Sequence, residues 1–423
     1  MGRTPGGGAL QENARPMQRR GDRVNFEDSA QEAAYRAEVR GWLDTNMREL
    51  KEQYPDLGAD LTVARAWQAR KAQARYARIT WPVESGGGGG TSIQQAIFTQ
   101  EESRCGAPQG YFGIGLGMCM PTLMKFAAAD VQRRFIGPAL RGEQIWCQLF
   151  SEPGAGSDIA GLRTRATRQG EGWVISGQKV WTTGAHYSDY GLLLARSDFD
   201  APKHQGLTMF WLDMRVPGVD IRAIHQMTGG SEFNEVYLSD VMIADAQRIG
   251  PAGEGWKVAL VTLMNERVEG GKERGPSLED ILGLARSIPR AQGTLADDPV
   301  FRQRLALWYI QAEGLRFTQL RSLTALSRGE TPGPEMSIGK LVAANRLQDL
   351  TERLIESQDQ FGVISDARYA PGGGRLQRDF LYAPSLRIAG GTDEILRNII
   401  AERVLGLPGD VRVDKAVDRK SVV

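Results

Sequence analysis

The stretch between residues 146 and 250 is rich in short β-type segments, and helical patterns stand on both sides of it. This order restricts the possible folds more than any other feature of the chain. A doubly wound dinucleotide-binding fold needs strands and helices to alternate, so the succession of helices, strands and helices argues against it. We therefore expect an α+β protein of several domains. The predicted strands are Trp173 to Ser176, Lys179 to Thr183, Gly191 to Ala195 and Leu207 to Leu212.

The predicted domain boundaries follow these changes of pattern. With 423 residues, the chain is long enough for two or three domains. The first helical pattern begins near Asn25, where Ser29 and Glu32 can form a capping box, and the glycines at 86–90 mark a loop. We predict a disordered arm, an N-terminal α-helical domain, a central β domain, a C-terminal α-helical bundle and a tail. Their residues are 1–24, 25–145, 146–250, 251–408 and 409–423.

Two dipeptides in the β domain are typical of tight turns. Gly177-Gln178 separates two of the β-type segments, and Pro217-Gly218 follows the last of them. We predict a hairpin turn at each. After Gly255 the helical period returns.

Charge and composition exclude several classes of function. With 52 basic and 51 acidic residues the net charge is +1, so we expect neither nucleic acid nor a membrane surface as a partner. No apolar run is long enough to span a membrane, and the arm lacks the apolar stretch of a signal peptide. Three cysteines without a CxxC pair favour a reduced compartment, and we predict a cytoplasmic protein. The three histidines lie far apart, so we predict no metal site.

Glycine-rich segments offer one candidate anion site. Glycines 113, 115 and 117 miss the G-x-G-x-x-G spacing, and Gly177-Gln178-Lys179 breaks the register of a P-loop. Gly390-Gly391-Thr392 opens an amphipathic helix, where free N–H groups and the helix dipole favour a phosphate or a carbonyl. Taken alone, the same residues are more typical of a flexible loop with Thr392 as the N-cap.

Three separated motifs together are more specific. They are S-E-P-G-A-G-S-D at 151–158, K-V-W-T-T-G at 179–184 and G-G-T-D-E-I at 390–395. A fourth segment, W-P-x-E-x-G-G at 81–87, precedes them and has the pattern of a helix-linking loop. Over residues 25–408 the chain resembles the acyl-CoA dehydrogenases, in which these motifs occur in the same order. The resemblance implies an N-terminal helical domain, a central β-barrel-like domain and a C-terminal four-helix bundle, with FAD held between the last two. It also implies an acyl-CoA substrate and an electron-transferring flavoprotein as the electron acceptor.

The resemblance assigns the cofactor site to residues of these motifs. Ser151 and Thr183 match positions that bond the flavin ring, and Trp181 matches an aromatic wall, although a lone tryptophan here would be read as a core residue of the β domain. Ser157 matches a position that contacts flavin and CoA. Thr392 and Glu394 match positions near the FAD ribose and pyrophosphate. The remaining cofactor candidates are Phe150, Gly156 and Thr182.

The dehydrogenation needs a carboxylate over the α-carbon of the thioester. Medium-chain-like members of the family place this glutamate just before the G-T pair, but here that position is Gly390, which cannot do acid–base chemistry. Isovaleryl- and long-chain-type members place a Glu-Arg pair on the first helix of the C-terminal domain, and Glu266-Arg267 matches that pair. We predict Glu266 as the base, rather than a solvated helix glutamate, and regard Glu269 and Glu273 as surface charges. The substrate-side candidates are Ser157, Arg267, Gly390 and Gly391.

Two other functions remain open. One is an acyl-CoA oxidase, in which O₂ reoxidises the flavin; its usual extra helical domain does not fit into 423 residues. The other is a flavin-poor, non-catalytic partner subunit, against which Glu266 argues. A base on the helix occurs in family members with branched or bulky acyl groups, which favours such a substrate.

The resemblance is incomplete on the adenine side of FAD. Homotetrameric members carry R-x-x-F-G after the base helix and Q-x-x-G-G before the last helices. The first motif is missing between Lys272 and Pro299, and the second reads D-Q-F-G-V at 359–363. We predict an α₂β₂ hetero-oligomer with a second dehydrogenase-like subunit. The alternative is a homo-oligomer in which Arg302 or Arg304 replaces the missing arginine.

Overall fold

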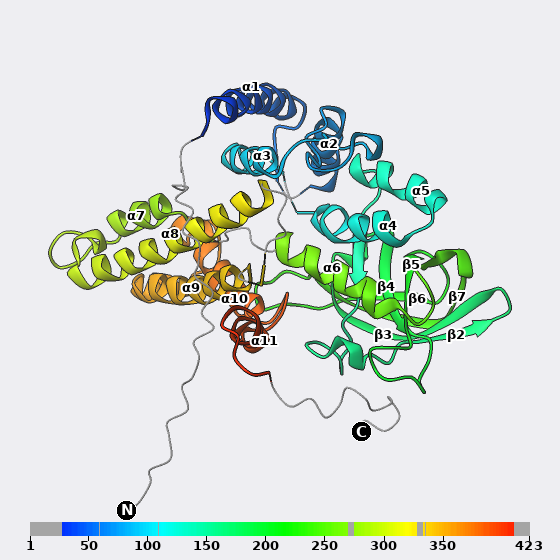
Figure 1. Cartoon of the computed structure of the whole chain (residues 1–423). Coiled ribbons are helices and arrows are strands. Elements are labelled where there is room, and N and C mark those ends of the chain that lie inside the picture. Colours follow the sequence, from blue (N-terminus) through cyan, green and yellow to red (C-terminus); the bar gives the residue numbers. More distant parts are fainter. Residues whose placement is uncertain are drawn as a thin grey trace, which may run out of the picture.

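A computed structural model gives the fold, and it describes residues 28–58, 60–108, 110–269, 275–327, 333–334 and 336–409. The predicted disordered arm lies outside the described residues, as does the predicted tail after residue 409. Figure 1 shows helices, then a twisted sheet, then further helices along the chain. The expected α+β fold class is therefore confirmed.

The N-terminal helices begin with the predicted capping box. Ser29 Oγ accepts from the Glu32 N–H, and the Glu32 carboxylate accepts from the Ser29 N–H. The first helix buries Val39, Leu43 and Leu50 on one face, against the two helices that follow it. The glycines at 86–90 form a loop, as predicted. The helices are α1 (Ala30–Gln53), α2 (Leu61–Gln73), α3 (Ser92–Arg104), α4 (Met120–Phe126) and α5 (Ala129–Leu140).

The middle of the chain forms one eight-stranded sheet. Its order is β6-β7-β3-β2-β4-β5-β8, and β1 runs parallel to β4. One face of the sheet packs on its own apolar core, to which Ile175, Phe210 and Val241 contribute. The strands are β1 (Trp146–Leu149), β2 (Arg165–Gln169), β3 (Gly172–Thr183), β4 (Tyr190–Arg196), β5 (Leu207–Asp213), β6 (Val219–Ala223), β7 (Phe233–Ala244) and β8 (Arg248–Ile249).

The hairpin predicted at Gly177-Gln178 is wrong, because the segments on both sides of it are parts of the single strand β3. Gly177 lies at a register shift of β3 against β7, and a Cβ there would come within 2.6 Å of Thr164 Oγ1. The glycine is thus explained by a bulge and a close approach, not by a turn. Pro217-Gly218 does form a turn, but the next strand, β6, pairs with β7 and not with β5.

The last part of the chain is helical again. Helix α6 packs its buried residues Val258 and Ala259 into the core shared by the N-terminal helices and the sheet. Helices α7 to α10 form a separate bundle around Trp308, Leu350 and Leu376. The helices are α6 (Gly255–Glu269), α7 (Leu278–Ser287), α8 (Pro299–Ser327), α9 (Met336–Glu356), α10 (Arg375–Leu386) and α11 (Asp393–Ile399).

Candidate active site

A buried ion pair joins the first two sequence motifs. The Lys179 side chain is fully buried on β3, and its ammonium lies 2.9 Å from Glu152 Oε1. The same ammonium donates to the carbonyls of Phe150 and Leu194 at 3.1 and 2.7 Å. All three ammonium protons are therefore used, and the segment after β1 is tied to the middle of β3.

Glu152 accepts further hydrogen bonds on the other side of this ion pair. The N–H groups of Arg163 and Thr164 donate to its two carboxylate oxygens at 2.6 and 2.8 Å. Burial alone would raise the pKa of Glu152, but the charge of Lys179 and these donors hold it below the ordinary glutamate value. Glu152 is thus a structural carboxylate, and its charge is compensated inside the protein.

The backbone conformation and the exposure of Trp181 are typical of a residue at a ligand site. Its φ is +58°, a left-handed conformation that is uncommon for a residue other than glycine, and its side chain is 58% exposed. It stands at a second register shift of β3, and its indole meets the Phe233 ring edge-on with 6.0 Å between centroids. Backbone strain of this kind costs roughly 1–3 kcal/mol and is concentrated at ligand sites.

Three hydroxyl groups lie on the segments next to this indole. The Val180 N–H donates to the Ser151 carbonyl at 2.9 Å, which aligns Ser151 with β3. In the described part of the chain, the half-buried hydroxyls of Ser151 and Thr183 have no hydrogen-bond partner, and the Thr182 hydroxyl is buried without one. An exposed indole beside unpaired hydroxyls fits a planar ring with polar edges, such as a flavin.

The remaining cofactor candidates lie in different surroundings. The Phe150 side chain is 2% exposed within the core, so only its backbone borders the motif. Gly156 and Ser157 are exposed on the turn after β1. Thr392 caps α11 by accepting from the Ile395 N–H, and Glu394 is exposed in the first turn of that helix. No hydrogen bond or ion pair between described residues joins this helix to the motifs of the β domain.

Glu266 and Gly390 meet in space. Glu266 is half-buried on α6, and a Cβ built on Gly390 would lie 3.6 Å from Glu266 Oε1. One turn before Glu266, the fully buried Thr262 hydroxyl lies 2.9 Å from the Thr122 hydroxyl on α4, which anchors α6. The two family positions for a catalytic glutamate therefore face the same space.

The Gly390-Gly391 turn has a conformation that requires glycine. Its φ angles are +66° and +97°, and the Gly391 carbonyl accepts from the ammonium of Lys340 on α9. The N–H groups of the two glycines donate to no other residue of the described chain. The N-cap at Thr392, one of the two interpretations of this segment, is therefore confirmed.

Three side chains with contacts in this region were given no role by the sequence, and the side-chain position of one candidate is not described. Glu152 and Lys179 belong to the motifs but were given no role, and Lys340 lies in no motif. Arg267 follows Glu266 on α6, but its side chain lies outside the described part.

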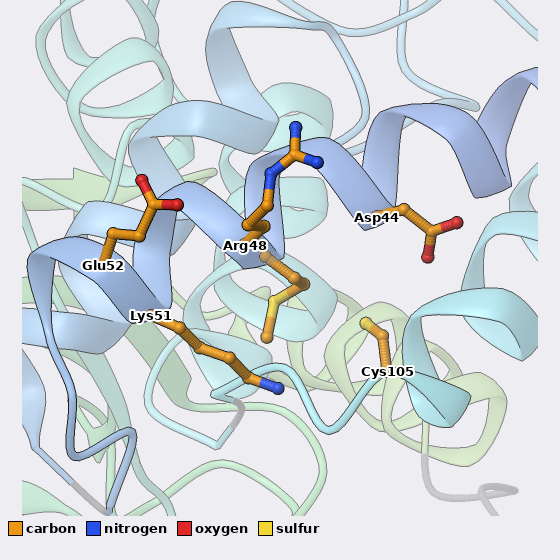
Figure 2. Close-up of a pocket in the computed structure, with 6 residues that line it drawn as sticks. Asp44, Arg48, Lys51, Glu52 and Cys105 are labelled. Atoms are coloured by element: carbon orange, nitrogen blue, oxygen red, sulfur yellow. The ribbon is translucent and has the colours of Figure 1, made fainter.

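Figure 2 shows a hollow on the N-terminal helices, far from these motifs in the sequence. It measures about 530 Å³ and is open to solvent. Most of its walls are charged side chains of α1, and none of the predicted site residues lines it. The lining residues are Asp44, Met47, Arg48, Lys51, Glu52 and Cys105. Among the described residues, no cluster of His, Cys, Asp and Glu has the arrangement of a metal site.

Comparison with known families agrees with the motifs. The models of the acyl-CoA dehydrogenase N-terminal, middle and C-terminal domains match residues 29–143, 147–241 and 253–405. The chain belongs to the acyl-CoA dehydrogenase family and is thus an oxidoreductase. None of the helices that the structure describes is long and apolar enough to cross a membrane.

Two curated relatives and two solved structures are similar to this chain over most of its length. Acyl-CoA dehydrogenase IpdE1 of Mycobacterium tuberculosis is 36% identical over 387 residues, covering 89% of this chain and 98% of IpdE1. Acyl-CoA dehydrogenase FadE34 of the same organism is 36% identical over 383 residues, 89% of this chain, which spans only 52% of FadE34. The Tcur3481-Tcur3483 steroid ACAD has a TM-score of 0.77 at 25% identity, and the ChsE4-ChsE5 complex from M. tuberculosis has 0.76 at 28%. Each match covers 91% of this chain and 100% of the other.

Proposed function

We propose that the chain catalyses the FAD-dependent α,β-dehydrogenation of an acyl-CoA thioester to a 2-enoyl-CoA, with Glu266 as the base. The observation that carries the proposal is the 3.6 Å between Glu266 Oε1 and the position of a side chain at residue 390. A carboxylate on α6 can therefore act where other family members use a glutamate of the turn. Because Gly390 has no side chain, the space beside the turn is left to the Glu266 carboxylate.

The turn supplies the second requirement of the reaction. An α-proton is acidic enough to remove only when hydrogen bonds stabilise the enolate charge on the thioester oxygen. We assign this contact to the Gly390 N–H, which is not used within the described chain, and place Gly391 and Arg267 on the substrate side. The proton leaves the α-carbon for the Glu266 carboxylate, and the hydride leaves the β-carbon.

The cofactor contacts follow from the exposed part of β3. When bound, FAD supplies the acceptor for the β-hydride. We propose that Trp181 covers its ring, that the hydroxyls of Ser151 and Thr183 bond the polar edge, and that the exposed turn with Gly156 and Ser157 contacts flavin and CoA. The backbone of Phe150 borders the same ring, and Thr392 and Glu394 serve the ribose and pyrophosphate. The half-buried Ser151 and Thr183, whose hydroxyls have no hydrogen-bond partner among the described residues, and the strained, exposed Trp181 support this assignment.

We propose a bulky acyl group with a fused-ring system as the substrate class. The name of one similar structure supports it, because that protein is a steroid ACAD. The glycine turn supports it as well, because it places no side chain between the base and the acyl group. We further propose an electron-transferring flavoprotein as the electron acceptor.

We also propose that the chain works as part of an α₂β₂ hetero-oligomer. The two similar structures with paired names support this, as does the altered D-Q-F-G-V segment, in which Val363 is 84% exposed. In addition, α8 carries exposed apolar side chains on one face, which is unusual for a surface that faces only water. These residues are Val300, Leu307, Ile310 and Phe317.

Anaerobic flavin bleaching tests the reaction. The holoenzyme should lose its yellow colour when mixed with a suitable acyl-CoA, and Glu266→Gln should slow this by roughly 10²- to 10⁴-fold while keeping its flavin. The matched control is Glu254→Gln, an exposed carboxylate just before α6, which should bleach at the wild-type rate. A Glu266→Gln variant as fast as the wild type would remove Glu266 as the base. Rapid reoxidation by O₂ alone would favour the oxidase.

Purification tests the partner. The chain expressed alone should contain little FAD and regain it on co-expression with a second dehydrogenase-like subunit. Each missing charge-assisted contact to the pyrophosphate is worth about 1.5–3 kcal/mol, which is enough to empty the site. A fully active homo-oligomer with one FAD per subunit would contradict this proposal and favour the local arginines Arg302 or Arg304.

A further inference from the structure

Lys340 links helix α9 to the turn that faces Glu266. Its ammonium donates to the carbonyl of Gly391, which lies 51 residues further along the chain. The side chain is partly buried, and three carboxylates act on its charge: Asp393, Glu266 and Glu394. Burial lowers the pKa of Lys340, while these three charges oppose that change.

A second set of contacts holds the end of the same turn. The Asp393 side chain is 2% exposed and accepts from Arg387 Nε at 2.8 Å and from Asn345 Nδ2 at 3.0 Å. The Asp393 N–H donates to the Arg387 carbonyl at 3.1 Å. The turn is therefore fixed where α10 ends and where α11 begins, but these contacts do not reach its two glycines.

The two glycines need a contact of their own. Glycine has more backbone freedom than any other residue, so two in succession can take many conformations between fixed ends. The hydrogen bond from Lys340 to the Gly391 carbonyl is the side-chain contact to these glycines within the described chain. It fixes the peptide between Gly391 and Thr392 at the end of the glycine pair, and Gly390, at the other end of the pair, lies beside Glu266.

We propose that Lys340 is a positioning residue for proton abstraction. Its ammonium fixes the Gly390-Gly391 turn beside Glu266, and its positive charge stabilises the carboxylate form of Glu266. The inference rests on the proposed function, since it concerns the same base and the same thioester contact. The charged groups around Lys340 are Glu266 on α6, Asp393 and Glu394 on α11, and Arg387 after α10, which is paired with Asp393.

Two substitutions separate the contact from the charge. Lys340→Met removes both, and the holoenzyme should be reduced by acyl-CoA about 10²-fold more slowly, as expected for a small misplacement of reacting groups. The acidic limb of its rate–pH profile should move to higher pH, because losing a nearby cation favours the protonated carboxyl group. Lys340→Gln removes the charge but keeps a hydrogen-bond donor for the Gly391 carbonyl. The acidic limb of its rate–pH profile should therefore move as far as that of Lys340→Met, while its plateau rate falls less than that of Lys340→Met.

Lys257→Met is the matched control. Lys257 lies on α6 with 72% of its side chain exposed, in a loose pair with Glu254 at 3.7 Å. This variant should keep both the wild-type rate and the wild-type pH profile. The flavin content and thermal midpoint of each variant are measured alongside, so that the rates are compared per bound flavin.

The outcomes distinguish this inference from the proposed function. If no acyl-CoA bleaches the wild-type holoenzyme, the proposed function fails first. If the wild type is bleached and Lys340→Met equals it in rate and profile, only the inference is overturned. If Lys340→Met is reduced slowly but the acidic limb of its rate–pH profile does not move, the inference is also overturned, because that result is expected of a residue that only supports the fold. If Lys340→Met does not fold with FAD, the limb of Lys340→Gln decides by the same criterion.

Discussion

The buried pair of Lys179 and Glu152 offers the sharpest test of how the flavin segments are held. Replacing Lys179 with Met leaves the Glu152 carboxylate 7% exposed with two backbone N–H donors but no cation. Removing one partner of a buried ion pair typically costs about 3–5 kcal/mol. Because Lys179 also serves the carbonyls of Phe150 and Leu194, we expect the upper part of this range.

A double variant separates the buried charge from the lost contacts. In Lys179→Met/Glu152→Gln the uncompensated charge is gone, and the amide oxygen can still accept from a backbone N–H. The remaining loss is about 1–3 kcal/mol, the usual cost of leaving buried carbonyls unpaired. The double variant should therefore be more stable than the single one, which simple counting of lost hydrogen bonds would not predict.

Urea unfolding followed by tryptophan fluorescence measures this order, together with the FAD content of each protein. Arg222→Met is the control, because Arg222 and Asp220 form an ion pair whose side chains are 61% and 55% exposed; it should unfold like the wild type. The pKa of Glu152 is lowered in the folded protein, so its stabilising effect is present above about pH 4.3 and is lost as the pH falls through the folded-state pKa. A Lys179→Met variant with wild-type stability, or a double variant less stable than it, would refute the reasoning.

Two further substitutions probe the strained positions. Trp181→Gly should leave the stability of the apoprotein within about 1 kcal/mol, because relief of the left-handed conformation offsets the lost edge-on contact with Phe233. Its FAD-to-protein ratio after gel filtration should fall, and a wild-type ratio would show that the indole does not hold the flavin. Adding Gly390→Glu to Glu266→Gln should restore part of the bleaching rate at a strain cost of about 1–2 kcal/mol, since the φ there is +66°. A flavin-containing double variant with no recovery would contradict the idea that the two positions are equivalent.

The sequence predicted the succession of helices and strands because each part has a clear period and clear ends. The capping box at Ser29 and the N-cap at Thr392 were found because such caps depend on neighbours within three residues. The hairpin at Gly177 was wrong for a related reason. A glycine in a β-type segment marks either a turn or a bulge, and here the deciding neighbour, Thr164, lies in another segment.

The candidate site shows a similar division. Ser151, Trp181 and Glu266 came from a family resemblance, and no periodicity of the sequence would have selected them. Lys179 was read as part of a motif, but a lysine is expected at the surface, and nothing local shows that it is fully buried. Lys340 could not be found at all, since its contact with Gly391 depends on how α9 packs against the last turn.

The meeting of Glu266 and Gly390 has a consequence for how such proteins are compared. If either position can deliver a carboxylate to one α-carbon, the base belongs to a place in space and not to a column of an alignment. A survey that demands glutamate before the G-T pair would count this chain as inactive. A survey that demands glutamate on the helix would discard the family members that carry it in the turn. Chains of this kind are better sorted by asking whether a carboxylate lies beside the turn, as Glu266 Oε1 does here at 3.6 Å from a Cβ built on Gly390. By that criterion, a glycine in the turn does not mean loss of activity when the helix carries the carboxylate. Activity is lost only when neither position has a glutamate.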